Sequence, residues 1–411
     1  MPDCGAGAYP LTYCTNVLPG ETLAEAQDGL ERTAVELRKR WGARGGEGRF
    51  PLGLWWSHGV VEALEDPARR ESFAAWLDER EFSIATLNCF PYGGFHRQRV
   101  KREVFRPGWH EAERVRYTLR AAEVLAELVP ENVRIPISTL SGTHKAWHEP
   151  GLLAAVAEGL ARCAVGLERL AERSGRDIVL AIEPEPFSTL ETTPEVVEFF
   201  EESLFRGPGA ALLKAQGMDA ESVVSRRLGL CYDTCHQAVE FESPVDSLRR
   251  LRAGGVAVHK VQLSSAPALR RPGEHPEALE VLRQFVEPRY LHQTFARTED
   301  GEIRRWEDLD EFFQRGMGAV RELEELRTHF HVPIDRASIP PLQTTQDDLR
   351  AALGEVVRST DSVTLEVETY TFAVFPTAGG LSAESDLVTS LDAELCAAER
   401  FLEEAVADSE R

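Results

Sequence analysis

Short apolar runs alternate along the chain with longer stretches in which apolar residues recur every three or four positions. The short runs predict strands, because an apolar run of about four to eight residues between turn signals is typical of a buried strand. The longer stretches predict amphipathic helices. We expect strands at 8–16, 52–57, 82–90, 132–140, 178–184, 227–234, 256–265 and 362–370. We expect helices at 22–41, 67–80, 111–128, 150–174, 194–204, 243–253, 344–357 and 381–408.

This alternation predicts a parallel sheet, since each parallel crossover needs a connecting element. The apolar runs are nearly continuous, as they are in strands that helices cover on the outer face. A doubly wound sheet is the rival, but no G-x-G-x-x-G follows the first run. Eight strand–helix units therefore favour an α/β fold of the (β/α)8 TIM-barrel type, with residues 1–411 as one domain.

Two segments are longer than a plain barrel needs. Residues 90–110 follow the third expected strand, and residues 266–340 separate the seventh and eighth. Within the second insert we expect a hairpin over 289–309, an acidic helix that ends near Arg327, and an extended segment over 328–334. Both inserts follow strands, so they should lie over the C-terminal face, where barrels keep their active sites.

Composition narrows the class of protein. The chain has 411 residues, 43% hydrophobic and 28% charged, which suits a large folded core. The net charge of −22 argues against a nucleic-acid partner, which requires a basic surface. No apolar run reaches the roughly 18 residues of a membrane span, and the N-terminus lacks the pattern of a signal peptide. Seven cysteines, an odd number, fit reduced thiols in a cytoplasmic protein.

Carboxylates stand at the ends of the fifth and sixth expected strands. Glu183 and Glu185 follow the apolar run IVLAI, where a carboxylate without a partner would be costly. Asp233 ends the sixth strand, and His236 follows three residues later in CYDTCH. Such a set can bind one metal ion or two neighbouring ones. The alternatives are a salt bridge at Glu183 and a helix cap at Asp233 that accepts a hydrogen bond from His236.

The eighth expected strand repeats the pattern with Glu366 and Glu368. Glu368 lies nearer the rim and is the better metal ligand, whereas Glu366 lies deeper unless the register differs by two residues. Three strand ends in this half of the barrel thus carry carboxylates after apolar runs.

Histidines supply the remaining candidate ligands. His329 and His331 flank Phe330 in an extended segment, so both imidazoles should face the same side. A mixed set of histidines and carboxylates suits zinc, manganese or iron. His259 lies inside the seventh strand and reads more simply as a core residue.

The loop after the third strand is locally basic and aromatic. Tyr92, His96 and Arg97 in this loop, with His144 after the fourth strand, are candidate substrate contacts. The loop could also act as a lid hinged on its glycines. The alternative is a solvated loop whose arginines pair with surface carboxylates.

These motifs resemble a known superfamily. LGLCYDTCH resembles the D-T-C-H strand end of the endonuclease IV class in the xylose-isomerase-like barrel superfamily, and Glu183, Asp233 and Glu368 are similar to its carboxylate ligands. The resemblance implies a histidine at the end of the seventh strand, where this chain has Gln262 or Ser264 instead. The candidates to replace that histidine lie in the insert: His292, His329 and His331.

A longer series of motifs resembles the EboE-type metabolite traffic proteins. The series is YCTNVLPGE, GLWWS, TLNCFPYGGFH, ISTLSGTHK, AIEPEP, CYDTCH, VQLSSA, YLHQTF, HFHVPI and LEVETYTF. The resemblance implies a role in making or exporting a specialised metabolite, with a membrane-protein partner from the same pathway. It leaves the reaction and the oligomeric state open.

The leading interpretation is a metal-dependent isomerase or epimerase of a polyol, sugar or cyclitol. Glu183, Asp233, His236, His329, His331 and Glu368 would bind the divalent ion, and Glu185 or Glu366 would move the proton. A second interpretation is a metal-dependent phosphoesterase acting on a small substrate. A third is a non-catalytic metabolite-binding protein.

Overall fold

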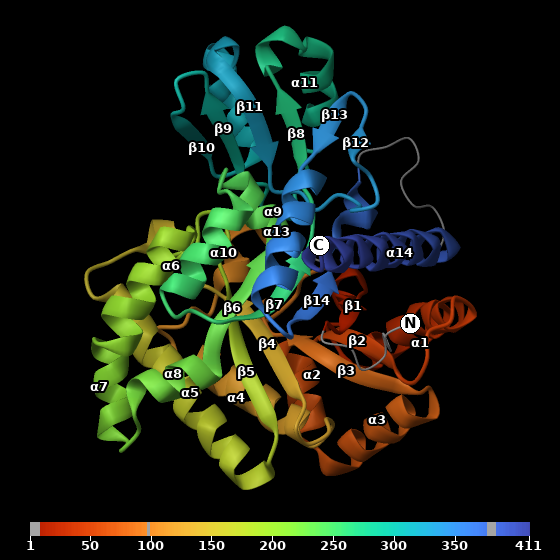
Figure 1. Cartoon of the computed structure of the whole chain (residues 1–411), viewed down its shortest axis with the longest axis vertical. Coiled ribbons are helices and arrows are strands. Elements are labelled where there is room, and N and C mark those ends of the chain that lie inside the picture. Colours follow the sequence, from red (N-terminus) through yellow and green to blue (C-terminus); the bar gives the residue numbers. More distant parts are fainter. Residues whose placement is uncertain (1–8, 97–98, 376–383) are drawn as a thin grey trace.

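Eight parallel strands form a barrel at the centre of the molecule (Figure 1). The computed structural model describes residues 9–96, 99–375 and 384–411. The barrel strands are β1 Leu11–Tyr13, β2 Phe50–Trp55, β3 Phe82–Asn88, β4 Arg134–Leu140, β5 Asp177–Glu183, β6 Leu228–Asp233, β7 Val258–Leu263 and β14 Thr364–Val367. Their order is β1-β14-β7-β6-β5-β4-β3-β2, and a parallel bridge between Cys14 and Gly53 brings β1 to β2. The predicted (β/α)8 barrel is confirmed.

Helices cover the outside of the barrel where the sequence predicts them. They are α1 Leu23–Ala43, α3 Pro67–Glu79, α4 Ala112–Ala126, α5 Leu152–Ser174, α6 Thr193–Phe199, α10 Pro244–Ala253, α13 Gln346–Ser359 and α14 Glu384–Ser409. The apolar stripe expected on α5 is buried at Leu152, Val156, Leu160, Cys163, Leu167 and Leu170. Gly175 ends α5 with a φ of 69°, which a glycine adopts without strain.

Outside the insert, four short helices of the described chain are not among the predicted elements: α2 His58–Leu64, α7 Pro208–Ala215, α8 Ala220–Arg227 and α9 Thr234–Val239. Helix α2 follows β2 closely, and α7 and α8 lengthen the connection between β5 and β6. Helix α9 is the most important for the site, because it begins directly at the end of β6 and carries His236.

The insert between β7 and α13 forms a second, antiparallel sheet of six strands in the order β10-β9-β11-β8-β13-β12. These strands are β8 Pro267–Arg270, β9 Thr294–Thr298, β10 Ile303–Trp306, β11 Leu323–Thr328, β12 Ser338–Ile339 and β13 Leu342–Thr344, with helix α11 Pro276–Arg283 beside them. Figure 1 shows this sheet at one end of the barrel, at the top of the view. It has its own apolar core, which includes Leu269, Phe285, Leu326 and Phe330.

The predicted acidic helix ends earlier than expected. Helical turns run through α12 Leu309–Glu311, a π-helical turn Phe312–Gly316 and a 3-10 helix Met317–Glu322, and the chain then forms strand β11, which pairs with β8 on one side and β9 on the other. Its sequence, LEELRT, has the residue types of a helix, but two ladders of backbone hydrogen bonds override that local preference. The predicted hairpin is confirmed as β9 and β10.

The interior of the barrel holds a buried ion pair. The Nζ of Lys260 on β7 lies 2.5 Å from Oε2 of Glu366 on β14, and both side chains are fully buried. Burial, the largest influence, works to lower the pKa of Lys260, but Glu366 and its neighbours raise it overall. A Cβ on Gly53 would lie 2.0 Å from Oε1 of Glu366, so only glycine fits beside this pair.

Glu394 on α14 connects three parts of the fold. Its Oε1 accepts hydrogen bonds from Oγ1 of Thr369 (2.7 Å) and the backbone N–H of Ile334 (2.9 Å). Its Oε2 accepts one from the hydroxyl of Tyr13 (2.8 Å). Thr369 follows β14 and Ile334 lies in the insert between β11 and β12, so one buried carboxyl fixes both segments to β1.

The six described cysteines, which leave out Cys4, are free thiols. In the described part of the chain, no helix combines the length and apolar character that crossing a bilayer requires.

Candidate metal centre

Three carboxylates meet at the C-terminal end of the barrel. Glu183 is the last residue of β5, Asp233 is the last residue of β6, and Glu368 follows β14. One oxygen from each lies within 4.8 Å of the others, and all three side chains are buried. We refer to Glu183, Asp233 and Glu368 as the carboxylate group.

Two oxygens in the carboxylate group have no hydrogen-bond partner among the described residues. These are Oε2 of Glu183 and Oδ2 of Asp233. Burial, together with the other carboxylates, raises the pKa of Glu183 and of Glu368 well above the usual value. Buried carboxylates without partners are costly, and a divalent cation would supply the missing partner. The residues therefore fit a metal ion.

Asp233 can serve both as the cap of α9 and as a metal ligand, the two roles that its sequence position suggests. Its Oδ1 accepts from the backbone N–H groups of Cys235 (2.7 Å) and His236 (2.9 Å), which caps α9. Oγ of Ser264 donates to the same oxygen at 2.7 Å. Burial works to raise the pKa of Asp233, but the neighbouring histidines and these hydrogen bonds lower it overall. The cap uses one oxygen and leaves Oδ2 free for an ion.

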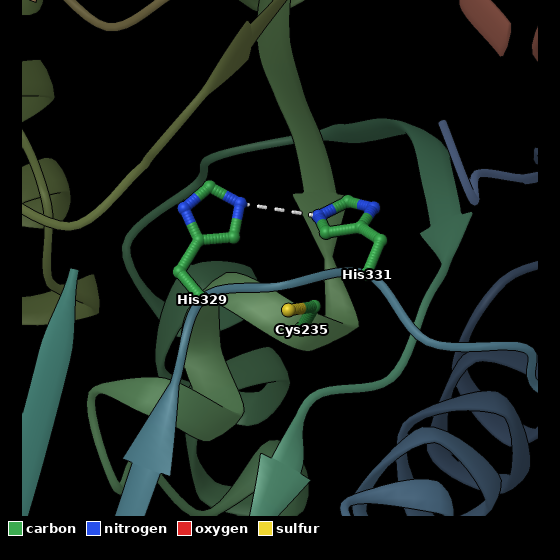
Figure 2. A group of neighbouring side chains, drawn as sticks. All are labelled: Cys235, His329 and His331. Carbon is green, nitrogen blue, oxygen red and sulfur yellow. Dashed lines mark hydrogen bonds between the residues drawn. The ribbon is translucent and has the colours of Figure 1, made fainter. Parts of the chain in front are cut away.

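Three imidazoles converge beside the carboxylate group. The Nε2 of His329 lies 3.1 Å from Nε2 of His236 and 3.2 Å from Nε2 of His331. Figure 2 shows His329 and His331 facing each other from the segment that follows β11, with Cys235 below them. Phe330 between them points into the insert core, as the alternation of an extended segment requires. We refer to His236, His329 and His331 as the histidine group.

The other nitrogen of each ring is tied to an oxygen. The Nδ1 contacts are His236 to the Pro184 carbonyl (3.0 Å), His329 to Oε1 of Gln293 (2.6 Å) and His331 to the Glu368 carbonyl (2.7 Å). Carbonyl oxygens only accept, so each Nδ1 carries the proton and each Nε2 presents a lone pair. Burial lowers the pKa of His236 to about 4 and lowers that of His329 and His331 as well.

Neutral imidazoles with converging lone pairs are the arrangement that a metal ion needs. Two nitrogens on a tetrahedral zinc ion, each at about 2.0–2.1 Å, lie about 3.3–3.4 Å apart. The observed separations of 3.1 and 3.2 Å are close to this value. The second-shell pattern also fits, because metal-bound histidines commonly donate their other N–H to an oxygen.

Asp233 lies between the two groups. Its Oδ2 is 4.0 Å from Nε2 of His236 and 3.9 Å from Nε2 of His331. The described residues also bring Sγ of Cys235 near His329 and His331. Burial raises the pKa of Cys235 well above its usual value, so it is a thiol in this state. The geometry therefore offers two ion positions that share Asp233.

Glu185 lies beside both groups but belongs to the cavity wall. Its Oε1 accepts a hydrogen bond from Nε2 of Gln293 at 2.9 Å and lies 3.7 Å from Nδ1 of His329. Burial raises the pKa of Glu185 to about 8, against the opposing hydrogen bond from Gln293. A carboxyl with a pKa near neutrality can both take up and release a proton.

The structure places Glu366 differently from Glu185. It pairs with Lys260 inside the barrel and does not line the cavity in the described part of the chain. The expectation that it lies deeper than Glu368 is confirmed.

Residues of the carboxylate and histidine groups line a cavity with about 560 Å³ of empty space, a volume that includes the solvent at its open mouth. Its floor is polar and consists of Asn16, Asn88, Glu183, Glu185, His236, His329, His331 and Glu368. The rest of the lining, which we call the roof, is largely apolar and consists of Phe90, Pro91, Phe95, Val100, Val104, Tyr290, Leu291 and Tyr370. Lys101 completes the lining.

Of the predicted substrate contacts, the three that the structure describes, Tyr92, His96 and His144, are not among the residues that line this cavity. The hydroxyl of Tyr92 donates to Glu113 at 2.6 Å, and the His144 ring packs against Phe105 with its centroid 5.1 Å away. His96 is packed against Trp55, and burial lowers its pKa to about 4. Arg97 lies outside the described residues.

Two basic residues of the same loop pair with the insert. Lys101 contacts Asp308, and Arg102 contacts Glu307. Pairing with carboxylates was the alternative interpretation of this loop, and here the partners come from the insert.

Sequence reasoning missed several residues that the structure brings to the site. Asn16 follows β1 and donates to Oε1 of Glu368 at 2.7 Å, and Gln293 holds both Glu185 and His329. Tyr290 and Tyr370 line the roof. The position of Asn16 at a strand end was an available signal, whereas Gln293 and Tyr290 lie in the insert, whose placement the sequence does not reveal.

At the end of β7, where the superfamily resemblance implies a histidine, Ser264 instead binds Asp233. His292 is not part of either ligand group. Its Nδ1 contacts the His329 carbonyl at 2.9 Å, and its Nε2 contacts Glu287 at 3.0 Å. Of the three candidate insert histidines, His329 and His331 thus reach the site.

The architecture is that of a (β/α)8 barrel with a candidate metal centre at the carboxyl ends of its strands. No protein-family model matches the sequence, and no match to a curated protein was found. Among solved structures, the chain is similar to an L-ribulose 3-epimerase, with 12% identity, a TM-score of 0.49 and 97% of this chain and 96% of the other covered.

It is similar to a D-psicose 3-epimerase solved in the presence of D-fructose, with 12% identity, a TM-score of 0.49 and coverage of 95% and 99%. It is also similar to an IolI protein with a bound zinc atom, with 11% identity, a TM-score of 0.42 and coverage of 97% and 98%. All three TM-scores are below 0.5, so the reaction has to be argued from the site itself.

Proposed function

We propose that the chain is a metal-dependent isomerase or epimerase that acts on a small polyol or sugar-like compound. The observation that carries this proposal is Glu185, a buried carboxyl with a pKa raised to about 8, on the cavity floor beside the carboxylate group. Such reactions need one group that moves a proton and a neighbouring cation that stabilises the developing negative charge.

In this mechanism, Glu183, Asp233 and Glu368 would hold the divalent ion. When bound, the ion would polarise a carbonyl or hydroxyl oxygen of the substrate. Glu185 would take a proton from the adjacent carbon and return it. Gln293 would keep the Glu185 carboxyl in place through the 2.9 Å hydrogen bond. Zinc, manganese and iron all suit the ligand types present.

A second candidate function is a metal-dependent phosphoesterase. The observation that favours it is the histidine group, which provides a second ion position next to the first, as two-metal hydrolases require. The cavity argues against it, because its only lysine or arginine among the described lining residues is Lys101, whose amine is bound to Asp308. A non-catalytic metabolite-binding protein is the third candidate, and the resemblance to EboE-type proteins supports a role in specialised metabolism.

Solvent exchange tests the proposal directly. The metal-loaded protein is incubated in D2O with ketohexoses and with keto-cyclitols, and incorporation of deuterium beside the carbonyl is followed by NMR. We expect exchange for at least one of these compounds, and no exchange by Glu185→Gln with its metal content retained. Hydrolysis of sugar phosphates without any exchange would support the phosphoesterase instead. A protein that contains no metal would contradict both enzymatic functions.

A further inference from the structure

The cavity joins two chemically different surfaces, and the roof comes from three distant parts of the chain. The loop after β3 provides Phe95, the insert provides Tyr290, and the segment after β14 provides Tyr370. Their ring centroids lie 4.9 Å (Phe95–Tyr290), 5.5 Å (Phe95–Tyr370) and 5.1 Å (Tyr290–Tyr370) apart. The floor below carries the ligand groups and Glu185.

The roof is fixed to the insert. The backbone N–H groups of Val100 and Lys101 donate to the Arg289 carbonyl at 2.9 and 3.1 Å. The amine of Lys101 donates to Oδ2 of Asp308 at 2.5 Å and to the Glu287 carbonyl at 3.1 Å. The roof is therefore a built wall of the cavity, and its apolar side chains stay next to the substrate position.

The same contacts remove positive charge from the cavity. Lys101 is the only lysine or arginine among the described residues that line it, and its amine is already paired. The floor carries the carboxyl groups of Glu183, Glu185 and Glu368, and each of its three imidazoles already donates its Nδ1 hydrogen to an oxygen of the protein. Away from the metal centre, a phosphate group in this cavity would meet the largely apolar roof and no free side-chain cation among the described lining residues.

An unsubstituted polyol fits the floor but not the roof. Hydroxyls that lie against Phe90, Val104 or Leu291 would lose hydrogen bonds to water without gaining others, which is unfavourable. A hydrocarbon or aromatic group in the same place would remove apolar surface from water, which is favourable.

We propose that the substrate is an uncharged amphiphile: a hydroxyl- or carbonyl-bearing head that reaches the metal centre, joined to a hydrocarbon or aromatic group that lies under the roof. This inference rests on the proposed function for the head group. It adds the substrate class, and it separates this site from one built for free sugars or sugar phosphates.

Paired hydroxamates test the roof without knowledge of the natural head group. Acetohydroxamate and hexanohydroxamate share a metal-chelating head and differ by four methylenes. Calorimetric titration of the zinc-loaded protein should show hexanohydroxamate binding at least tenfold more tightly, since each buried methylene contributes. In Leu291→Ser, which alters the roof, this ratio should fall below threefold. Leu153→Ser, at a leucine that is 40% exposed on α5, is the matched control and should leave both affinities unchanged.

A second titration tests whether the cavity excludes a charged substrate. D-fructose 6-phosphate should bind more weakly than D-fructose or not at all, and tighter binding of the phosphate would overturn the uncharged class. Equal affinities for the two hydroxamates would overturn the apolar subsite while leaving the metal-dependent function intact. A protein that holds no metal and binds neither hydroxamate would instead defeat the proposed function, and this inference with it.

Discussion

The carboxylate group and the histidine group lie side by side but are held in different ways. Glu183 ends β5 and Asp233 ends β6, and each of these barrel strands pairs with a neighbouring strand on both sides. His329 and His331 follow a strand of the insert sheet, and each depends on an oxygen that fixes its Nδ1. The barrel alone can thus assemble one ion position, whereas the other requires the insert to be folded and docked.

The largest expected effect is at the residue that the two groups share. Asp233→Ala removes the oxygen between them, so the metal content measured by mass spectrometry should fall to near zero. The variant also loses the cap of α9, which costs about 1 kcal/mol. Asp219→Ala is the matched control, because Asp219 caps α8 through Ser222 far from the site. It should lose similar stability and no metal. Unchanged metal in Asp233→Ala would move the site elsewhere.

A second variant separates catalysis from metal binding. Glu185→Gln keeps the shape of the side chain but cannot take up a proton, so we expect kcat to fall by about 10²–10⁴ with the metal retained. In the wild-type protein, Glu185 acts as a base only when ionised, so kcat/KM should rise with pH through about 8, the raised pKa, or through a lower pH when a bound cation favours the ionised form. A flat pH profile in this range would remove Glu185 from the proton-transfer step.

The third variant tests whether the two groups are independent. In protein loaded with excess zinc, so that both positions can fill, His329→Ala should bind about one equivalent less while the carboxylate group keeps its ion, whereas Glu183→Gln should weaken binding at the carboxylate group. His275→Ala is the control, since this insert histidine is half-exposed and contacts Glu277. Complete loss of metal in His329→Ala would show that the two groups bind as a single unit.

The smallest effect concerns Glu394, the buried carboxyl that connects β1, the segment after β14 and the insert. Burial raises the pKa of Glu394 to about 7, above its ordinary 4.5. Between these values the folded protein holds a proton that the unfolded chain releases, so this contribution is complete below about pH 4.5 and is lost as the pH rises to about 7. We expect a loss of ~3 kcal/mol from this group alone.

The measurement compares denaturant unfolding of the wild type and Glu394→Gln at several pH values. The difference in the free energy of unfolding should change between pH 4.5 and 7 and stay constant above pH 7. Glu404→Gln on the same helix, where Glu404 pairs with Arg350 at the surface, is the control and should follow the wild type. Parallel curves for the wild type and Glu394→Gln would contradict the assignment.

The sequence predicted the barrel and the carboxylate group well because both depend on local pattern. A carboxylate directly after an apolar run marks a strand end, and all parallel strands of a barrel end on the same face. This local signal was enough to place Glu183 and Asp233 at the mouth of the barrel. Phe330 flanked by two histidines was also a local signal, since alternation alone puts His329 and His331 on one face.

The rest depended on contacts between distant residues. His236 and His329 are 93 positions apart and meet only because β11 pairs between β8 and β9. The sequence of β11 favours a helix, so its strand pairing could not be read locally. The substrate contacts expected at Tyr92 and His144 rested on their place in loops, and their partners Glu113 and Phe105 decide where these side chains lie.

Phe330 has a consequence beyond its place between two ligands. It belongs to the core of the insert, where its ring packs against Phe285 and Phe375. Any change in the volume of that core displaces the backbone that carries His329 and His331, although none of these phenylalanines touches an ion position. Substitutions in the insert core around Phe330 should therefore change metal affinity by shifting the backbone that carries His329 and His331, with the ligand residues unchanged.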